Sequence, residues 1–179
     1  MRAWKSNEEV EIIFDESKKN RFFLVCKWDR KLPCCLFIML NPSTADMRGC
    51  DPALDKCIKI AKFNGFGSIS VVNLFSLRTP KPSDLLNSTE RTLPKNREFI
   101  KEAIENADKI VAAWGEKGQW FNACFPVLKY LDDRGKDLYH LGVNKYGWPK
   151  HPLFIKADTK FKEYFFDESS SVGRIEEKR

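Results

Sequence analysis

Polar side chains that could do chemistry follow four short apolar runs of this chain. Asn41 ends the first run, Asn73 the second and Trp114 the third, and His151 comes shortly after the fourth. An amide both donates and accepts hydrogen bonds, so an asparagine can orient a water molecule or read the edge of a base. Asparagine is a poor base, so a reaction that it assists should need little deprotonation in the transition state. Histidine supplies a hydrogen bond or a charge to a developing oxyanion, and aromatic side chains can stack on a base.

Each of these residues also has a purely structural interpretation. Asn41-Pro42-Ser43 could close a strand as an Asx turn, and Ser43 with Asp46 resembles a capping box. Trp114 could be an ordinary core residue and His151 an exposed loop residue. A shared site is favoured because all of them follow strands at one edge of the predicted sheet, where open parallel sheets bind their ligands.

Two common catalytic motifs are absent from the chain. There is no glycine-rich phosphate loop with a lysine, and no Gly-x-Ser-x-Gly nucleophile elbow. The six cysteines include no Cys-x-x-Cys pair, and the two histidines lie far from any cysteine pair. We therefore expect reduced thiols, no bound metal and no cofactor.

Apolar runs alternate with helical patterns in a way that predicts an α/β fold. Strands are expected at 10–14, 21–28, 34–40, 68–75, 109–114 and 138–143, and helices at 96–107 and 120–131, with an earlier helix that starts at the Asp51 cap and Pro52 and ends at Gly65. The first two strands form a hairpin, and the later alternation predicts a three-layer α/β/α domain with a central, mostly parallel four-stranded sheet. Pro126 kinks the third helix unless that helix begins near it.

Length, charge and hydropathy narrow the class of protein. The 179 residues predict a single domain over 1–166, with a tail at 167–179 that we expect to be flexible. The net charge of +6 suits a polyanionic partner and an ordinary basic surface equally well. No apolar stretch reaches the roughly 18 residues of a membrane span, and the N-terminus lacks an apolar signal core. We expect a cytoplasmic protein without a membrane partner, and the sequence leaves its oligomeric state open.

The order of the strand-end motifs resembles the uracil-DNA glycosylase superfamily over roughly residues 34–155. The matching motifs are Leu40-Asn41-Pro42-Ser43, Val72-Asn73, Ala113-Trp114-Gly115 and His151-Pro152-Leu153. In that superfamily the first motif holds a water-positioning residue, the second a base-reading asparagine, and the last a histidine or asparagine loop. The chain departs from the pattern at Met39, where glycine is usual, and at Leu153, where serine is usual.

The chain is also similar over most of the domain to a bacterial family, domain of unknown function 1643. The similarity lies in Asn41-Pro-Ser-Thr-Ala-Asp46, Val71-Val-Asn-Leu-Phe75 with Leu77-Arg78, Ala112-Ala-Trp-Gly115, and Leu141-Gly142 leading to His151-Pro-Leu153. This second resemblance implies no particular activity.

The glycosylase resemblance implies a role for each candidate residue in excising a flipped-out damaged or modified base. Asn41 would hold the attacking water and His151 would stabilise the leaving base. Asn73 would read the base edge. The full substrate-binding set is expected to be Ser43, Thr44, Asn73, Phe75, Arg78, Trp114, Gly115 and Lys145, with Phe75 or Trp114 stacking on the base and Arg78 and Lys145 contacting phosphate. DNA or a nucleotide is the expected partner.

Two alternatives stay open at this point. The protein could be a binding module that recognises a nucleotide or modified nucleic acid without turnover. It could also be another hydrolase on the same scaffold, acting on a small nucleoside-like substrate with Asp46 as its base, since one fold hosts many chemistries.

Overall fold

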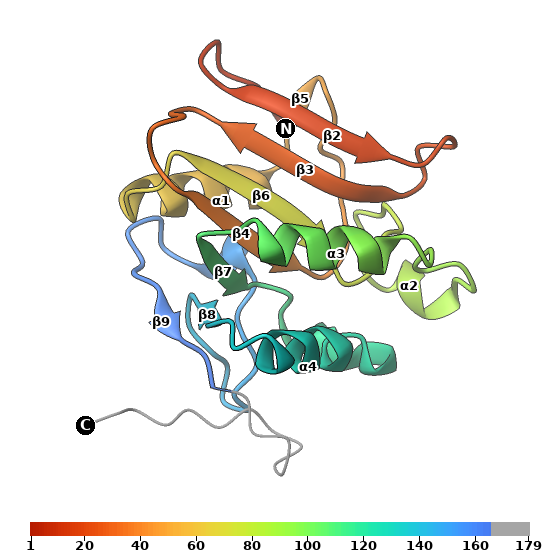
Figure 1. Ribbon diagram of the computed structural model, residues 1–179. Coiled ribbons are helices and arrows are strands. Elements are labelled where there is room, and N and C mark those ends of the chain that lie inside the picture. Colours follow the sequence, from red (N-terminus) through yellow and green to blue (C-terminus); the bar gives the residue numbers. More distant parts are fainter. Residues whose placement is uncertain (166–179) are drawn as a thin grey trace.

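A seven-stranded mixed sheet runs through residues 1–165, the part of the chain that the computed structural model describes (Figure 1). The strand order is β2–β3–β6–β4–β7–β8–β9, and the strands are β2 (Glu9–Phe14), β3 (Arg21–Lys27), β4 (Cys34–Met39), β6 (Ser68–Asn73), β7 (Lys109–Ala112), β8 (Tyr139–His140) and β9 (Lys162–Glu163). Strand β4 pairs in parallel with β6 and β7, and β7 pairs in parallel with β8. The pairs β2–β3, β3–β6 and β8–β9 are antiparallel. A separate two-stranded sheet joins β1 (Arg2–Ala3) to β5 (Gly49–Cys50).

Helices cover both faces of this sheet because its central strands are apolar on both sides. Side chains alternate along β4, so Leu36 and Ile38 enter one core cluster while Cys35 and Phe37 enter the other. The first cluster packs against α3 (Asn96–Glu105) and α4 (Phe125–Asp133), and the second packs against α1 (Pro52–Phe63). A single turn of helix, α2 (Asp84–Asn87), lies between β6 and α3.

The start of α1 is as the sequence predicts. Asp51 is the N-cap, and its side chain accepts a hydrogen bond of 2.9 Å from the backbone N–H of Leu54. Pro52 occupies the first turn, where its missing N–H costs nothing. The helix ends at Phe63, and Gly65 follows it at φ +84°, a conformation that favours glycine.

Three predictions about the elements need correction. The N-terminal hairpin is present, but the sheet has seven strands rather than four, because β3 pairs with β6 and extends the same sheet. The helix expected at 120–131 begins instead at Phe125, with Pro126 in its first turn. A 3₁₀ segment, η1 (Glu116–Asn122), precedes it and includes Phe121 at φ +53°. The strand expected at 138–143 is reduced to the two residues of β8.

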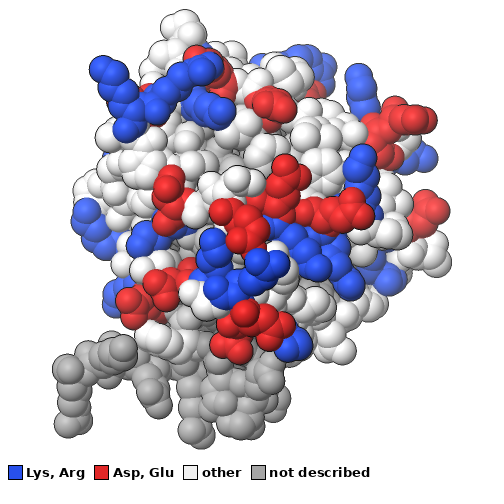
Figure 2. All heavy atoms as spheres, in the orientation of Figure 1, with Lys and Arg blue, Asp and Glu red and all other residues white. Residues whose placement is uncertain are grey.

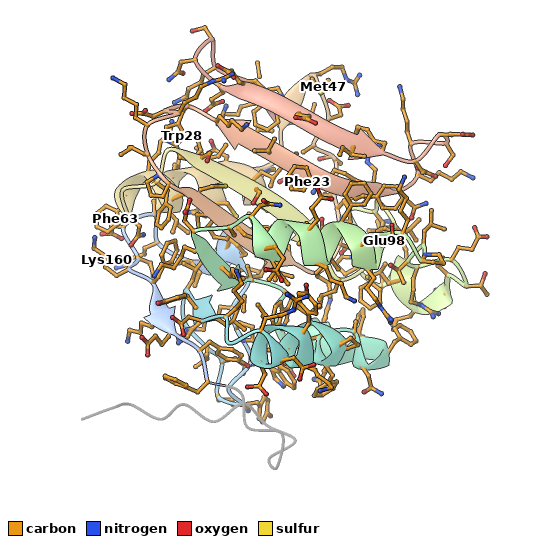
Figure 3. All side chains as sticks on the ribbon, in the orientation of Figure 1. Phe23, Trp28, Met47, Phe63, Glu98 and Lys160 are labelled. Atoms are coloured by element: carbon orange, nitrogen blue, oxygen red, sulfur yellow. The ribbon has the colours of Figure 1, made fainter. Side chains whose placement is uncertain are left out.

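The chain returns toward α1 after β8, and this return brings the segment around His151 to the sheet edge. A 3₁₀ turn, η2 (Pro152–Phe154), begins directly after His151. Further on, the carbonyl oxygen of Thr159 accepts from Nδ2 of Asn64 at 2.9 Å. The ammonium of Lys160 lies 4.6 Å from the ring centre of Phe63. Figure 3 labels both side chains near the end of α1.

Charged groups on the face that carries α3 and α4 are mixed in sign, as Figure 2 shows. Among residues 1–165, no helix combines the length and the apolarity that crossing a membrane requires. The tail predicted at 167–179, and the domain boundary at 166, lie outside the described residues.

Candidate functional site

A cavity of about 610 Å³ opens beyond the carboxyl ends of β4 and β7. Its wall is built from the end of β4, the loop after β6, the loop after β7, the start of α1, the segment before and within η2, and one residue of β3. This is the volume of a typical small-molecule site, at the place where parallel sheets bind ligands.

Five of the predicted site residues line this cavity although they come from distant parts of the chain. They are Asn41, Ser43, Trp114, Gly115 and His151. Gly115 and His151 are close neighbours, because a Cβ on Gly115 would lie 3.8 Å from the Cβ of His151. Gly115 has φ +75°, which a residue with a side chain adopts only with strain.

The amide of Asn41 is oriented by two backbone carbonyls. Its Nδ2 donates to the carbonyl oxygen of Pro42 at 2.9 Å and to that of Thr79 at 2.8 Å. Both amide hydrogens are therefore used, and Oδ1 is the atom left to accept a hydrogen bond from a water or ligand. This is the geometry that a water-positioning residue needs.

The imidazole of His151 is held in one tautomer by the turn that follows it. The backbone N–H of Leu153 donates to Nδ1 at 3.4 Å, so in the neutral ring Nε2 carries the proton. Burial lowers the pKa of His151 below its usual 6.5, although the charge of Asp51 opposes this shift. The ring is therefore neutral at pH 7 and offers an N–H donor.

Trp114 belongs both to the core and to the cavity wall. Its side chain is 1% exposed, and it packs within the cluster that contains α3 and α4. In the loop that follows Trp114, Gly118 packs directly against the indole, and a Cβ at this position would lie only 2.0 Å from Cδ1 of Trp114. Trp148, also buried, contributes a second indole to the same wall.

Sequence reasoning missed Arg21, the residue of β3 that reaches the cavity. It is only 2% exposed, and its Nη2 donates to Oδ1 of Asn73 at 3.4 Å. Its Nε and Nη1 have no hydrogen-bond partner, and burial lowers the pKa of the guanidinium to about 10. The signal that could have found it is an arginine at the start of a strand that is otherwise apolar, Arg21-Phe-Phe-Leu-Val-Cys.

Asn73 does not line the cavity itself. It is the last residue of β6, pairs in register with Met39 of β4, and is buried behind Arg21. Its backbone oxygen accepts from Nδ2 of Asn96 at 2.9 Å, which anchors the strand end to α3. The structure thus connects Asn73 to the cavity through the Arg21 guanidinium.

Comparison with known proteins gives one match. A family model described as "Protein of unknown function (DUF1643)" matches residues 21–153. The chain belongs to this family. The matched segment runs from the first residue of β3 into η2, so it includes Arg21, Asn41 and His151. No curated protein matches the chain, and no solved structure does.

In this DUF1643 chain, two predicted residues near Asn41 lie outside the cavity. Thr44 is exposed. Asp46 forms an ion pair of 2.7 Å with Arg48, whose hydrogen bond keeps the pKa of the Asp46 carboxyl low. Neither is among the lining residues.

Three further predicted residues of the DUF1643 chain also lie elsewhere. Phe75 lines a second cavity of about 780 Å³ beside α3 and η1. Arg78 donates to the carbonyl oxygen of Lys18 at 2.8 Å and lies over the ring of Phe14. Lys145 is exposed and lies over the ring of Tyr146.

The cysteines lie away from the cavity wall. Within residues 1–165, no three His, Cys, Asp or Glu side chains are grouped so that they could hold a metal ion. None of the cysteines lines the cavity, and burial raises the pKa of Cys26, Cys50 and Cys124 to about 12. The polar side chains that line the cavity carry amide, hydroxyl, imidazole, guanidinium, ammonium and carboxylate groups.

Proposed function

We propose that this protein is a DNA glycosylase-like enzyme that recognises a flipped-out damaged or modified nucleobase and hydrolyses its N-glycosidic bond. The observation that carries the proposal is that the acceptor oxygen of Asn41 and the neutral imidazole of His151 share one cavity. Trp114 lines the same cavity, and a planar ring can pack against an indole.

The chemistry follows from what each side chain can do. A water that donates to Oδ1 of Asn41 attacks C1′ of the nucleotide as the C1′–N bond breaks and its electron pair moves to the base. The Nε2 proton of His151 stabilises the negative charge that develops on that base. Asparagine does not remove the water's proton, so the proton leaves after attack, to solvent or to the released base. This sequence suits a transition state with oxocarbenium character, in which the sugar is already a strong electrophile.

The rim of the cavity also suits a nucleic acid. Lys117 and Lys150 line it together with one exposed carboxylate, Glu116, and the two lysines can contact phosphate. Leu153 and Phe154 stand beside them, and Phe154 is 82% exposed. Exposed apolar side chains next to a basic rim can contact unstacked bases when a duplex is opened.

The fold supports the same proposal. Strands β6, β4, β7 and β8 are consecutive and mutually parallel, with helices packed on both sides. We infer a three-layer arrangement of the uracil-DNA glycosylase type around these four strands. Under this proposal, β3 supplies the cavity with a residue, Arg21, that the strand-end motifs did not indicate.

The alternative hydrolase that uses Asp46 as its base has less support. Asp46 is paired with Arg48 and does not line the cavity. The alternative binding module shares the whole cavity and differs only in showing affinity without turnover.

A panel of oligonucleotides tests the proposal. Duplexes and single strands carrying uracil, hypoxanthine, xanthine and alkylated or oxidised bases are incubated with the protein, and abasic sites are detected by alkaline cleavage. We expect cleavage of at least one substrate, and Asn41→Ala should lower its rate about 10²–10³-fold. Asn87→Ala, the same substitution at an exposed position outside the cavity, is the matched control and should keep the rate. Binding of a modified strand without any abasic sites would favour the binding module instead.

A further inference from the structure

The guanidinium of Arg21 is a buried hydrogen-bond donor group that the protein itself leaves incomplete. The side chain is 2% exposed and lines the cavity, yet its Nε and Nη1 have no partner. Buried donors are nearly always satisfied, so unpaired donors on a buried side chain that lines a cavity indicate a ligand that accepts from that side chain. A guanidinium has five N–H donors, and Asn73 accepts from one of them, on Nη2.

The donors that Asn73 does not use still include two adjacent N–H groups along one edge of the guanidinium. One edge of a guanidinium pairs Nε–H with a hydrogen of Nη2, and the other pairs a hydrogen of Nη1 with the second hydrogen of Nη2. Whichever Nη2 hydrogen points to Asn73, the other edge keeps both of its donors. Asn73 is itself anchored, because its backbone oxygen accepts from Asn96. Arg21 is thereby held in one orientation and can read a pair of adjacent acceptors.

Charge and shape around Arg21 favour a neutral planar ligand over an anion. Asp51 is 3% exposed and lines the same cavity. Its charge raises the pKa of Arg21 against the larger lowering by burial, and this effect exceeds the lowering by the charge of Arg78. The Arg21 charge therefore already has a carboxylate nearby. The adjoining wall is largely apolar and includes the indoles of Trp114 and Trp148. A flat heterocycle with two neighbouring acceptor atoms matches this surface better than a phosphate does.

We propose that Arg21 determines base specificity by reading the O6 and N7 acceptors of an oxopurine, and this inference rests on the proposed function. Arginine makes this bidentate contact with guanine in the major groove of DNA, and hypoxanthine presents the same two acceptors. Adenine carries an amino group at position 6, so a donor of the base would face a donor of the guanidinium and no hydrogen bond could form there. Uracil offers the O4 carbonyl beside the C5–H group and satisfies only one donor of the edge.

Direct binding of free bases tests this inference. Isothermal titration with hypoxanthine, adenine, uracil and inorganic phosphate is carried out on the full chain, and hypoxanthine and adenine form the critical pair because they differ at position 6. We expect hypoxanthine to bind at least about tenfold more tightly than adenine or uracil, as a bidentate contact predicts. Arg21→Lys keeps the charge but loses the two-donor edge of the guanidinium, and should remove most of the preference for hypoxanthine. Thermal melting checks that the variant is folded, and the wild-type comparison stands even if it is not.

Three results would overturn the inference. They are adenine or uracil binding as tightly as hypoxanthine, a folded Arg21→Lys protein that keeps the preference, and phosphate binding with no base bound. These outcomes are distinct from failure of the proposed function. If the protein excises bases without any preference for oxopurines, the specificity role of Arg21 is contradicted and the glycosylase proposal stands. If hypoxanthine binds selectively through Arg21 but no base is excised, the inference about Arg21 is supported and the glycosylase proposal is contradicted.

Discussion

Asn41 and His151 owe their orientation to backbone groups of their own loops. The Asn41 amide donates both of its hydrogens, to the carbonyls of Pro42 and Thr79. The backbone N–H of Leu153 donates to Nδ1 of His151. Sequence reasoning found these two residues because each follows a predicted strand at the edge where open parallel sheets bind their ligands. Arg21 could not be found in this way. Its burial depends on β3 pairing with β6, a contact between segments that are far apart in the chain.

The two histidines make stability depend on pH. Burial lowers the pKa of His140 and of His151 below 6.5, so the unfolded chain takes up protons at a pH where the folded chain does not. The free energy of unfolding should fall as the pH drops below 6.5. It should also fall at alkaline pH, because the unfolded chain loses protons from thiols such as Cys26, whose pKa burial raises in the folded chain. The shifted carboxylates, such as Glu8 and Asp55, have pKa values lowered from 4.5 and 3.8 and therefore titrate in a more acidic window.

Urea denaturation at pH 7.5 and at pH 5.5 measures this effect. His140→Asn keeps an acceptor for the N–H of Gly142, which donates to Nδ1 of His140 at 2.8 Å, but cannot be protonated. The variant should show a smaller loss of stability between the two pH values than the wild type. An equal loss in both proteins would show that His140 does not contribute.

At the scale of elements, the start of α1 was predictable and the region before α4 was only partly so. Asp51-Pro52 is a local signal that needs no tertiary contact. The segment at 116–124 forms a 3₁₀ helix and a turn because Gly118 must pack against Trp114, which local propensity does not reveal. Pro126 allowed two interpretations, and the helix beginning near it is the one observed. Strand β9 has two residues and carries no periodic pattern.

The N-cap of α1 gives a prediction at this scale. Asp51→Ala removes the acceptor for the Leu54 N–H, whereas Asp51→Asn keeps an oxygen in its place. Both variants lose the charge near Arg21, so the difference between them isolates the cap hydrogen bond. The alanine variant should unfold with about 1 kcal/mol less free energy than the asparagine variant in urea denaturation. No difference between the two variants would contradict the capping role.

The whole molecule depends on the hairpin being part of the main sheet. The sequence indicated the strands, most of the helices and the parallel alternation. It did not indicate the strand order, because every buried strand here has a similar apolar run and the pairing is decided by contacts between distant segments. The order β3–β6–β4 is what brings Arg21 beside Asn73 and into the cavity.

Leu24 on β3 tests that integration. It is fully buried in the cluster shared with α1, so Leu24→Ala should lower the free energy of unfolding by about 2–5 kcal/mol. Leu86→Ala is the matched control, since Leu86 is 48% exposed and should change stability by about 0.5 kcal/mol or less. Equal, small losses in both variants, measured by chemical denaturation, would mean that the hairpin is peripheral.

The most direct test of the central proposal is a crystal structure of the Asn41→Ala variant with the best substrate of the oligonucleotide panel. Removing the amide slows excision, so the intact nucleotide should be trapped. We predict that its base lies inside the 610 Å³ cavity against Trp114, with C1′ facing position 41 and the base within hydrogen-bond distance of His151. A complex in which every base lies outside this cavity would contradict the proposed function.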